Sequence, residues 1–165
     1  MSIDGVHFKI CEPFPFSEKW YSHKFKAAAL TYEIALGIRS GDIVWAHGGY
    51  PAGAYPDDKL VRTAFLGALD RDLNEHVIAD NGYDSLPFFI SPVKHRFETG
   101  DLYARRVLAR HENVNARIQK FKILRERYYG DIKFHPTIFH AIVNICQVEI
   151  DNMHKLPDVQ GLYDN

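Results

Sequence analysis

The stretch Val77-Ile78-Ala79-Asp80-Asn81-Gly82-Tyr83 most constrains what this chain can fold into. Three apolar residues that end in a carboxylate, followed by Asn-Gly, predict a short buried strand that stops in a tight turn. Such a strand delivers its terminal acid to the carboxyl edge of a sheet, where open α/β sheets place their chemistry. Asp80 is therefore the first candidate functional residue, although an Asp before Asn-Gly is also ordinary turn chemistry.

Length and composition predict one globular domain. The 165 residues are 46% apolar and 25% charged, which is ordinary for such a domain, and they are too few for two large cores. No apolar run approaches the roughly 20 residues needed to cross a bilayer, and Asp4 and His7 interrupt the stretch that a signal peptide would keep apolar. Cys11 and Cys146 match no metal-binding spacing and favour a reducing compartment, with a single disulfide left open.

The hydrophobic pattern predicts a mixed order of strands and helices. Period-two alternation indicates strands, Gly- and Pro-rich stretches indicate loops, and apolar residues at steps of three and four indicate helices. The expected elements are a strand over 2–10 with a kink or bulge at Gly5, a hairpin of 27–38 with a strand from 43, a helix over 57–69, the strand ending at Asp80, a weak edge strand within 85–93, a helix over 102–128, a final helix from Pro136, and a frayed tail from Lys155.

This order is the layout of an RNase H-like α/β fold. An antiparallel meander of three strands is joined by parallel strands in a mixed sheet with flanking helices. In that layout the first and fourth strands are neighbours, so Asp4 and Asp80 are predicted to lie close together. We expect this domain to occupy residues 1–150, followed by a C-terminal tail at 151–165.

The helix over 102–128 carries a third acid and many basic residues. Glu112 lies one position off the apolar stripe Val107, His111, Val114, Ile118 and Phe121, which places it at the border between core and solvent. Between Arg105 and Arg127, eight basic residues stand against two acids, which favours phosphate contact over an ordinary solvated face. The candidate DNA-binding residues are Arg110, Arg117, Lys120 and Lys122.

Three carboxylates from two strand ends and a helix would form a site of hard oxygen ligands. Mg²⁺ or Mn²⁺ suits such a site, and two ions about 3.5–4 Å apart can support phosphodiester chemistry. Taken alone, Glu112 is more simply a solvated helix acid. The nine histidines show no spacing typical of a zinc site, so we read most of them as surface or partly buried polar residues.

Several sequence blocks resemble the DDE-superfamily endonucleases of the Harbinger transposase type, which have an RNase H-like core. Their first catalytic strand resembles residues 2–7, and Ala79-Asp80-Asn81-Gly82-Tyr83 is similar to their second catalytic block. The other blocks that resemble the family, in the same order, are 20–26 with 30–33, the loop 51–57, and 110–115 with 120–122.

The resemblance implies Mg²⁺- or Mn²⁺-dependent cleavage and joining of DNA at transposon ends or a target. Carried over by position, Asp4, Asp80 and Glu112 are the expected catalytic and metal-binding acids. Asp57 would be an auxiliary acid, and we leave it outside the triad because helix capping already explains it. The resemblance implies a nuclear location in a eukaryote and a cytoplasmic one otherwise, with no membrane partner, and it leaves open a homodimer.

The chain also departs from the family it resembles. Nothing here corresponds to the helical DNA-binding region that precedes the first catalytic block in such transposases, which predicts a chain truncated at its N-terminus or a degenerate copy. A separate DNA-binding subunit or domain would then be a partner. The alternatives are a catalytically inactive DNA- or protein-binding module of the same origin, and an unrelated metal phosphatase or nuclease on the same fold.

Overall fold

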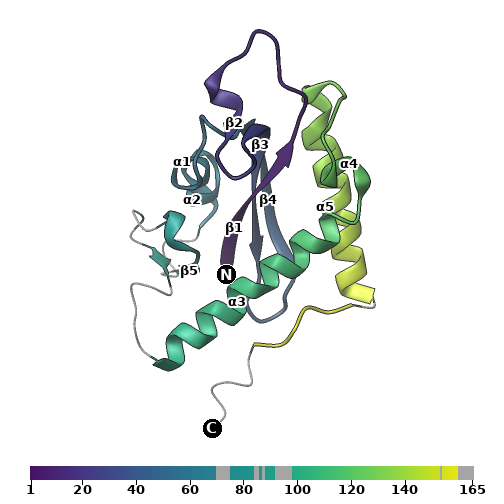
Figure 1. Cartoon of the computed structure of the whole chain (residues 1–165). Helices are drawn as coiled ribbons and strands as arrows, with labels where there is room; N and C mark the ends of the chain where they lie inside the picture. The colour runs from purple at the N-terminus through teal and green to yellow at the C-terminus, as the bar shows by residue number, and fades with distance from the viewer. Residues whose placement is uncertain (70–74, 84–85, 87, 92–97, 153, 160–165) are drawn as a thin grey trace.

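The computed structural model describes residues 1–69, 75–83, 86, 88–91, 98–152 and 154–159. In this part of the chain a six-stranded mixed sheet has helices on both faces, as Figure 1 shows. No described helix is both long enough and apolar enough to span a bilayer. The elements are β1 (Ser2–Lys9), β2 (Tyr21–Ser22), β3 (Ala27–Leu36), β4 (Ile43–Pro51), α1 (Asp57–Thr63), α2 (Phe65–Ala68), β5 (Val77–Ile78), β6 (Phe89–Ile90), α3 (Glu98–Ile118), α4 (Lys122–Arg125) and α5 (His135–Asn152), with short 3₁₀ turns at Glu18–Trp20, Asn81–Tyr83 and Ile132–Phe134.

The strand order confirms the expected RNase H-like sheet. Strands run β2-β3-β1-β5-β6, and β4 pairs with β3. The β1–β3 and β3–β4 pairs are antiparallel, which confirms the predicted meander and hairpin, whereas β1–β5 and β5–β6 are parallel. The weak edge strand is confirmed as the two-residue β6, at the end of the order.

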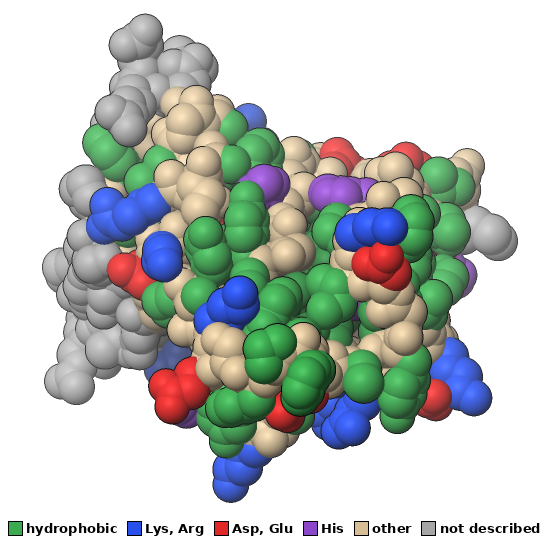
Figure 2. Space-filling view, turned by 90° about the horizontal axis from the view of Figure 1, so that it is seen from above, with side chains coloured by type: hydrophobic (Ala, Val, Ile, Leu, Met, Phe, Trp, Pro, Cys, Tyr) green, Lys and Arg blue, Asp and Glu red, His purple; other side chains and the backbone are tan. Residues whose placement is uncertain are grey.

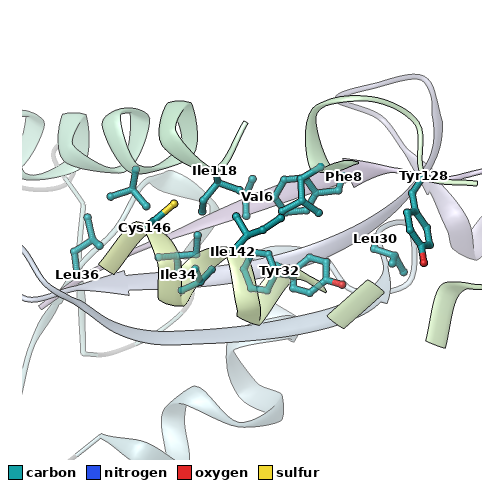
Figure 3. Close-up of a cluster of buried hydrophobic side chains, with 14 of the residues drawn as sticks. Val6, Phe8, Leu30, Tyr32, Ile34, Leu36, Ile118, Tyr128, Ile142 and Cys146 are labelled. Atoms are coloured by element: carbon teal, nitrogen blue, oxygen red, sulfur yellow. The ribbon is translucent and has the colours of Figure 1, made fainter. Parts of the chain in front are cut away.

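Two hydrophobic layers cover the sheet. On one face, β1 and β3 pack against α3 and α5, and Figure 3 shows this cluster, in which Tyr32 and Ile34 of β3 lie beside Ile142 and Cys146 of α5. On the other face, α1 and α2 bury Val61 and Phe65 against β1, β3 and β5. Because β3 is covered on both faces, every residue from Ala28 to Leu36 is buried.

The helix predicted over 102–128 is shorter at its C-terminal end than expected. It begins at Glu98 and ends at Ile118, and Phe121 adopts an extended conformation before the single turn of α4. The chain then returns to the end of β1, where the Tyr128 N–H donates to the Lys9 carbonyl at 2.9 Å. Tertiary pairing therefore ends the helix, and no Gly or Pro in the sequence signals it.

Two further local expectations are wrong. The β1–β3 register continues through Gly5 without a shift, so this strand has no bulge there, and the irregularities lie between β3 and β4. The tail expected to fray from Lys155 is packed over residues 154–159, where Leu156 and Val159 are buried. The rest of the tail, 160–165, lies outside the described residues.

Candidate active site at the edge of β1 and β5

The parallel register of β1 and β5 carries Asp4 and Asp80 to the same level of the sheet. Ser2 pairs with Ile78, and each acid lies two residues beyond its member of that pair. Side chains two residues apart on a strand point to the same face, so the two carboxylates leave the sheet side by side. Asp80 is exposed, and its Oδ1 accepts a hydrogen bond from the Gly82 N–H at 2.8 Å. The turn chemistry expected at Asp80 is therefore present, and it fixes the carboxylate at the strand end.

Helix α3 brings Glu112 to the same place. The preceding residue, His111, is buried, and its Nε2 lies 3.0 Å from Ser2 Oγ, which ties α3 to the start of β1. Burial lowers the pKa of His111 to about 4, so this side chain is neutral at neutral pH. Glu112 is exposed and lines a pocket of about 280 Å³, whose walls are formed by Asp4, Asp80, Arg105, Leu108, Ala109 and Glu112.

The negative charges of these acids repel one another. Burial first, and then the negative charges of Asp80 and Asp57, raise the pKa of Asp4 to about 6, while Lys24 and a hydrogen bond from the Gly5 N–H act against them. Asn115 Nδ2 lies 3.5 Å from Asp4 Oδ2, at the limit of a hydrogen bond. The site thus holds partly buried carboxylates without enough positive charge among the described residues to keep the pKa of Asp4 at its usual value.

Asp57 belongs to this cluster, contrary to the capping role that the sequence suggested. The residue before α1 is Pro56, and no side chain caps that helix. The Asp57 carboxylate instead lies against Gly5, and a Cβ at Gly82 would lie 3.1 Å from Asp57 Oδ2. Burial and then Asp80 raise the pKa of Asp57. The sequence did contain a signal for this: Gly5 follows Asp4 and Gly82 lies two residues after Asp80, and the absence of side chains at these glycines leaves room for the Asp57 carboxylate.

Two buried polar groups lie behind the acids, and sequence reasoning missed both. Glu33 of β3 pairs with Gly5 and is fully buried, with Oε1 accepting a 3.0 Å hydrogen bond from Trp45 Nε1. Its Oε2 has no partner among the described residues, and neither does the hydroxyl of the fully buried Tyr83. The pKa of Glu33 is raised to about 7. Burial is the main cause, the Trp45 hydrogen bond acts against it, and the charge of Asp57 adds to the rise. The pKa of Tyr83 is raised by burial and then by all four neighbouring acids.

The donor set fits a hard divalent cation in its chemistry. The negatively charged groups that line the site are all carboxylates, whose oxygens are the ligands that Mg²⁺ and Mn²⁺ prefer. A bound cation would relieve the repulsion that contributes to the raised pKa of Asp4. Among the described residues, no three His, Cys, Asp or Glu side chains are close enough to form a metal site as they stand. The three predicted acids therefore share a pocket without yet converging on one point.

The predicted DNA-binding residues fall into two groups. Arg110 and Arg117 are buried in α3 and donate to main-chain carbonyls. Arg110 donates to Pro157 (2.7 Å), in the segment after α5, and to Ile38 (2.6 Å), just after β3. Arg117 donates to His154 (2.6 Å), also after α5. Because these guanidinium groups are buried against main-chain carbonyls, they are not exposed for contact with phosphate. Lys120 and Lys122 are exposed, and they pair with Glu149 at 3.6 Å and Glu126 at 3.8 Å.

Replacing Arg110 by Ala is expected to destabilise the fold by about 3 kcal/mol, because two hydrogen bonds from a buried charged donor are lost and both carbonyls lose their partner. Urea unfolding followed by circular dichroism measures this loss. Arg106→Ala, an exposed position on the same helix, is the matched control and should change stability by less than about 0.5 kcal/mol. Equal losses in the two variants would contradict the structural role of Arg110.

Comparison with known families places the site in context. A family model described as DDE superfamily endonuclease matches residues 3–148, a range that includes Asp4, Asp57, Asp80 and Glu112. Searches of curated proteins and of solved structures gave no match.

Proposed function

Because the chain belongs to the DDE superfamily endonucleases, we propose that it is a metal-dependent DNA endonuclease or transposase catalytic domain of the Harbinger type. The observation that carries this proposal is the pocket in which acids from β1, from the end of β5 and from α3 meet: Asp4, Asp80 and Glu112 are 76 and 32 residues apart in sequence and line one cavity. Carboxylates this close together repel one another unless a bound cation compensates their charge, either alone or together with an anionic substrate.

Asp4, Asp80 and Glu112 would hold two Mg²⁺ or Mn²⁺ ions, and Asp57 is placed to assist from the α1 side. When bound, the ions supply activation of the attacking oxygen and stabilisation of the leaving oxygen of a phosphodiester. The residues of this chain do the positioning. The Asx turn fixes Asp80, and His111 and Ser2 fix the α3 helix that carries Glu112. Arg105, on the pocket wall, would contact substrate phosphate in this proposal.

The substrate in this proposal is DNA, at transposon ends or at a target, cleaved by hydrolysis and then joined by strand transfer. The location is nuclear in a eukaryotic source and cytoplasmic otherwise. A homodimer, or a separate DNA-binding subunit or domain, would supply sequence recognition, because phosphate contacts by themselves carry no sequence information.

Nicking of supercoiled plasmid by the purified full chain tests the proposal. With Mg²⁺ or Mn²⁺ we expect conversion of supercoiled to open-circular DNA, and with EDTA we expect none, because the carboxylates alone cannot activate water for phosphodiester cleavage. A folded protein that nicks with neither metal would overturn the catalytic proposal.

A second candidate function follows from the spread of the acids. Since no three described acids converge at coordination distance and Glu112 is exposed, a catalytically inactive module that binds DNA or a protein would fit the same fold. Salt-sensitive DNA binding in EDTA without metal-dependent nicking would favour this second function, because phosphate contacts weaken steeply with salt.

A further inference from the structure

A row of residues leads away from the acids along the α1-facing side of β1. Positions 5, 7 and 9 share that side because side chains alternate along a strand. Asp57 covers Gly5, His7 follows, and Lys9 comes last. The row spans about 13 Å, which is the axial length of about four nucleotides of one strand in a DNA duplex.

The turn between β2 and β3, which we call the 22–27 hairpin, lies over the far half of this row. Ser22 Oγ lies 2.8 Å from His7 Nδ1 and accepts a hydrogen bond from the Phe25 N–H at 3.3 Å. The Phe25 ring meets His7 edge-on with centroids 6.4 Å apart, and Lys9 Nζ lies 5.0 Å from the centre of the same ring. Side chains of the hairpin (Ser22 and Phe25) and of β1 (His7 and Lys9) therefore hold the hairpin against β1.

The tip of the 22–27 hairpin is positively charged and close to the acids. His23, Lys24 and Lys26 are exposed there, and the hairpin contains no acid. Lys24 lies near enough to the site for its charge to act against the raised pKa values of Asp4 and Asp57, and it also helps burial to lower the pKa of His7 to about 4. The charge of Lys24 therefore acts both on the acid cluster and on His7 in the row that leads to Lys9.

These lysines differ from those that the sequence singled out. Lys120 and Lys122 already have carboxylate partners, whereas neither Lys9 nor Lys24 has an ion pair within 4 Å among the described residues. Lys9, beside the Phe25 ring, and the exposed Lys24 offer two contacts that nucleic-acid strands use: phosphates pair with lysine, and sugars and bases contact aromatic faces. Figure 2, which looks down on the end of the molecule that is uppermost in Figure 1, shows Lys, Arg and His side chains interspersed with hydrophobic ones.

We propose that the 22–27 hairpin and Lys9 form the track along which a DNA strand approaches the acids from the α1 side of β1, where Asp57 lies against Gly5, with Lys24 contacting the phosphate nearest the acids and Lys9 a phosphate further along. This inference rests on the proposed nuclease function, and it adds to it a substrate-binding surface on the opposite side of β1 from α3. Because the contacts are to phosphate, the track favours DNA over other partners by charge and spacing and carries no base specificity.

Binding of a fluorescent 20-base-pair duplex, and of one of its strands alone, to the full chain in EDTA tests the proposal by fluorescence anisotropy. The double variant Lys9→Ala/Lys24→Ala should bind at least about tenfold more weakly than the wild type at 0.1 M salt. Its plot of log K against log salt should be shallower by about 2, because each phosphate contact contributes about 0.9 to the slope for duplex DNA. Lys24→Arg should retain most of the affinity, since it keeps the charge. The two probes show whether the track takes a duplex or a single strand.

Lys133→Ala is the matched control. Lys133 is exposed, as Lys24 is, and it lies over the Phe134 ring at 4.9 Å, which repeats the Lys9–Phe25 contact far along the chain in the 3₁₀ turn before α5. Within the described part of the chain it pairs, unlike Lys9 and Lys24, with a carboxylate, that of Asp131 at 2.9 Å. Its affinity and salt slope should equal those of the wild type. Unchanged affinity and slope in the Lys9/Lys24 double variant, or an equal loss in Lys133→Ala, would overturn the track.

The outcomes separate this inference from the proposed function. Binding that depends on Lys9 and Lys24 without metal-dependent nicking would support the track and overturn catalysis. Metal-dependent nicking with unchanged binding by the double variant would support catalysis and overturn the track. A wild-type chain that binds neither probe would overturn the track whatever its nicking.

Discussion

Replacing Asp80 by Asn is expected to reduce metal-dependent nicking by at least about 100-fold while leaving the fold intact. Loss of a supporting group around a metal ligand alone typically costs 10–100-fold, so loss of a ligand should cost at least the upper end of that range. Asn can still accept the hydrogen bond from the Gly82 N–H, and Asp80 is exposed, so the turn at the end of β5 should survive. Initial rates of plasmid nicking in Mn²⁺, with a thermal unfolding curve for each protein, measure the effect.

Asp131→Asn is the matched control for Asp80→Asn. Asp131 makes the same kind of turn, accepting a hydrogen bond from the Lys133 N–H two residues on at 3.1 Å, and it lies outside the acid cluster. The control should nick plasmid at the wild-type rate. If Asp80→Asn and the wild type nick equally fast, Asp80 holds no catalytic ion, and the activity comes from another site or another protein.

Replacing Glu33 by Gln is expected to stabilise the protein by up to about 3 kcal/mol at pH 8 and to change little at pH 4. The pKa of Glu33 rises from 4.5 to about 7 on folding, chiefly because the group is buried. The folded state therefore keeps a proton that the unfolded state releases, so stability falls as pH rises from about 4.5 to about 7 and stays lower above that window. A difference of about 2.5 pH units corresponds to about 3 kcal/mol, and the neutral Gln removes this cost.

Urea unfolding of both proteins at pH 4, 6 and 8 measures the Glu33→Gln difference. Asp4 titrates in the same range in both proteins, so its contribution cancels in the comparison. Glu126→Gln, at an exposed carboxylate with only surface ion pairs, is the control and should change stability by less than about 1 kcal/mol at every pH. A Glu33→Gln difference that is the same at every pH, or a loss of stability at pH 8, would show that the folded protein holds Glu33 as a paired anion.

The sheet and the first two acids could be predicted from sequence because short-range patterns determine them. Period-two alternation located β1 and β3, and the order of elements placed β1 beside β5, so the neighbourhood of Asp4 and Asp80 followed from topology alone. The Harbinger assignment and the catalytic roles of the acids go further than topology and stay proposals.

The remaining features depended on contacts between distant segments, which a pattern cannot show. Any acid suits the start of a helix, so nothing local distinguished Asp57 from an ordinary first-turn residue. Counting charges assigned Arg110 and Arg117 to phosphate, because the carbonyls that they bind are far away in the sequence: those of Pro157 and His154 follow the helix, and that of Ile38 precedes it. Glu33 is a polar position on an alternating strand, and only the packing of α1 over that face makes it buried.

The contact of Asp57 with Gly5 and Gly82 has an evolutionary consequence. A side chain at position 5 would collide with the Asp57 carboxylate, and one at position 82 would crowd it, so neither glycine can be replaced without displacing Asp57. Natural variants of this domain should therefore change these positions in concert: a lineage that acquires Ala or Ser at position 5 should also have a shorter or differently oriented residue at position 57.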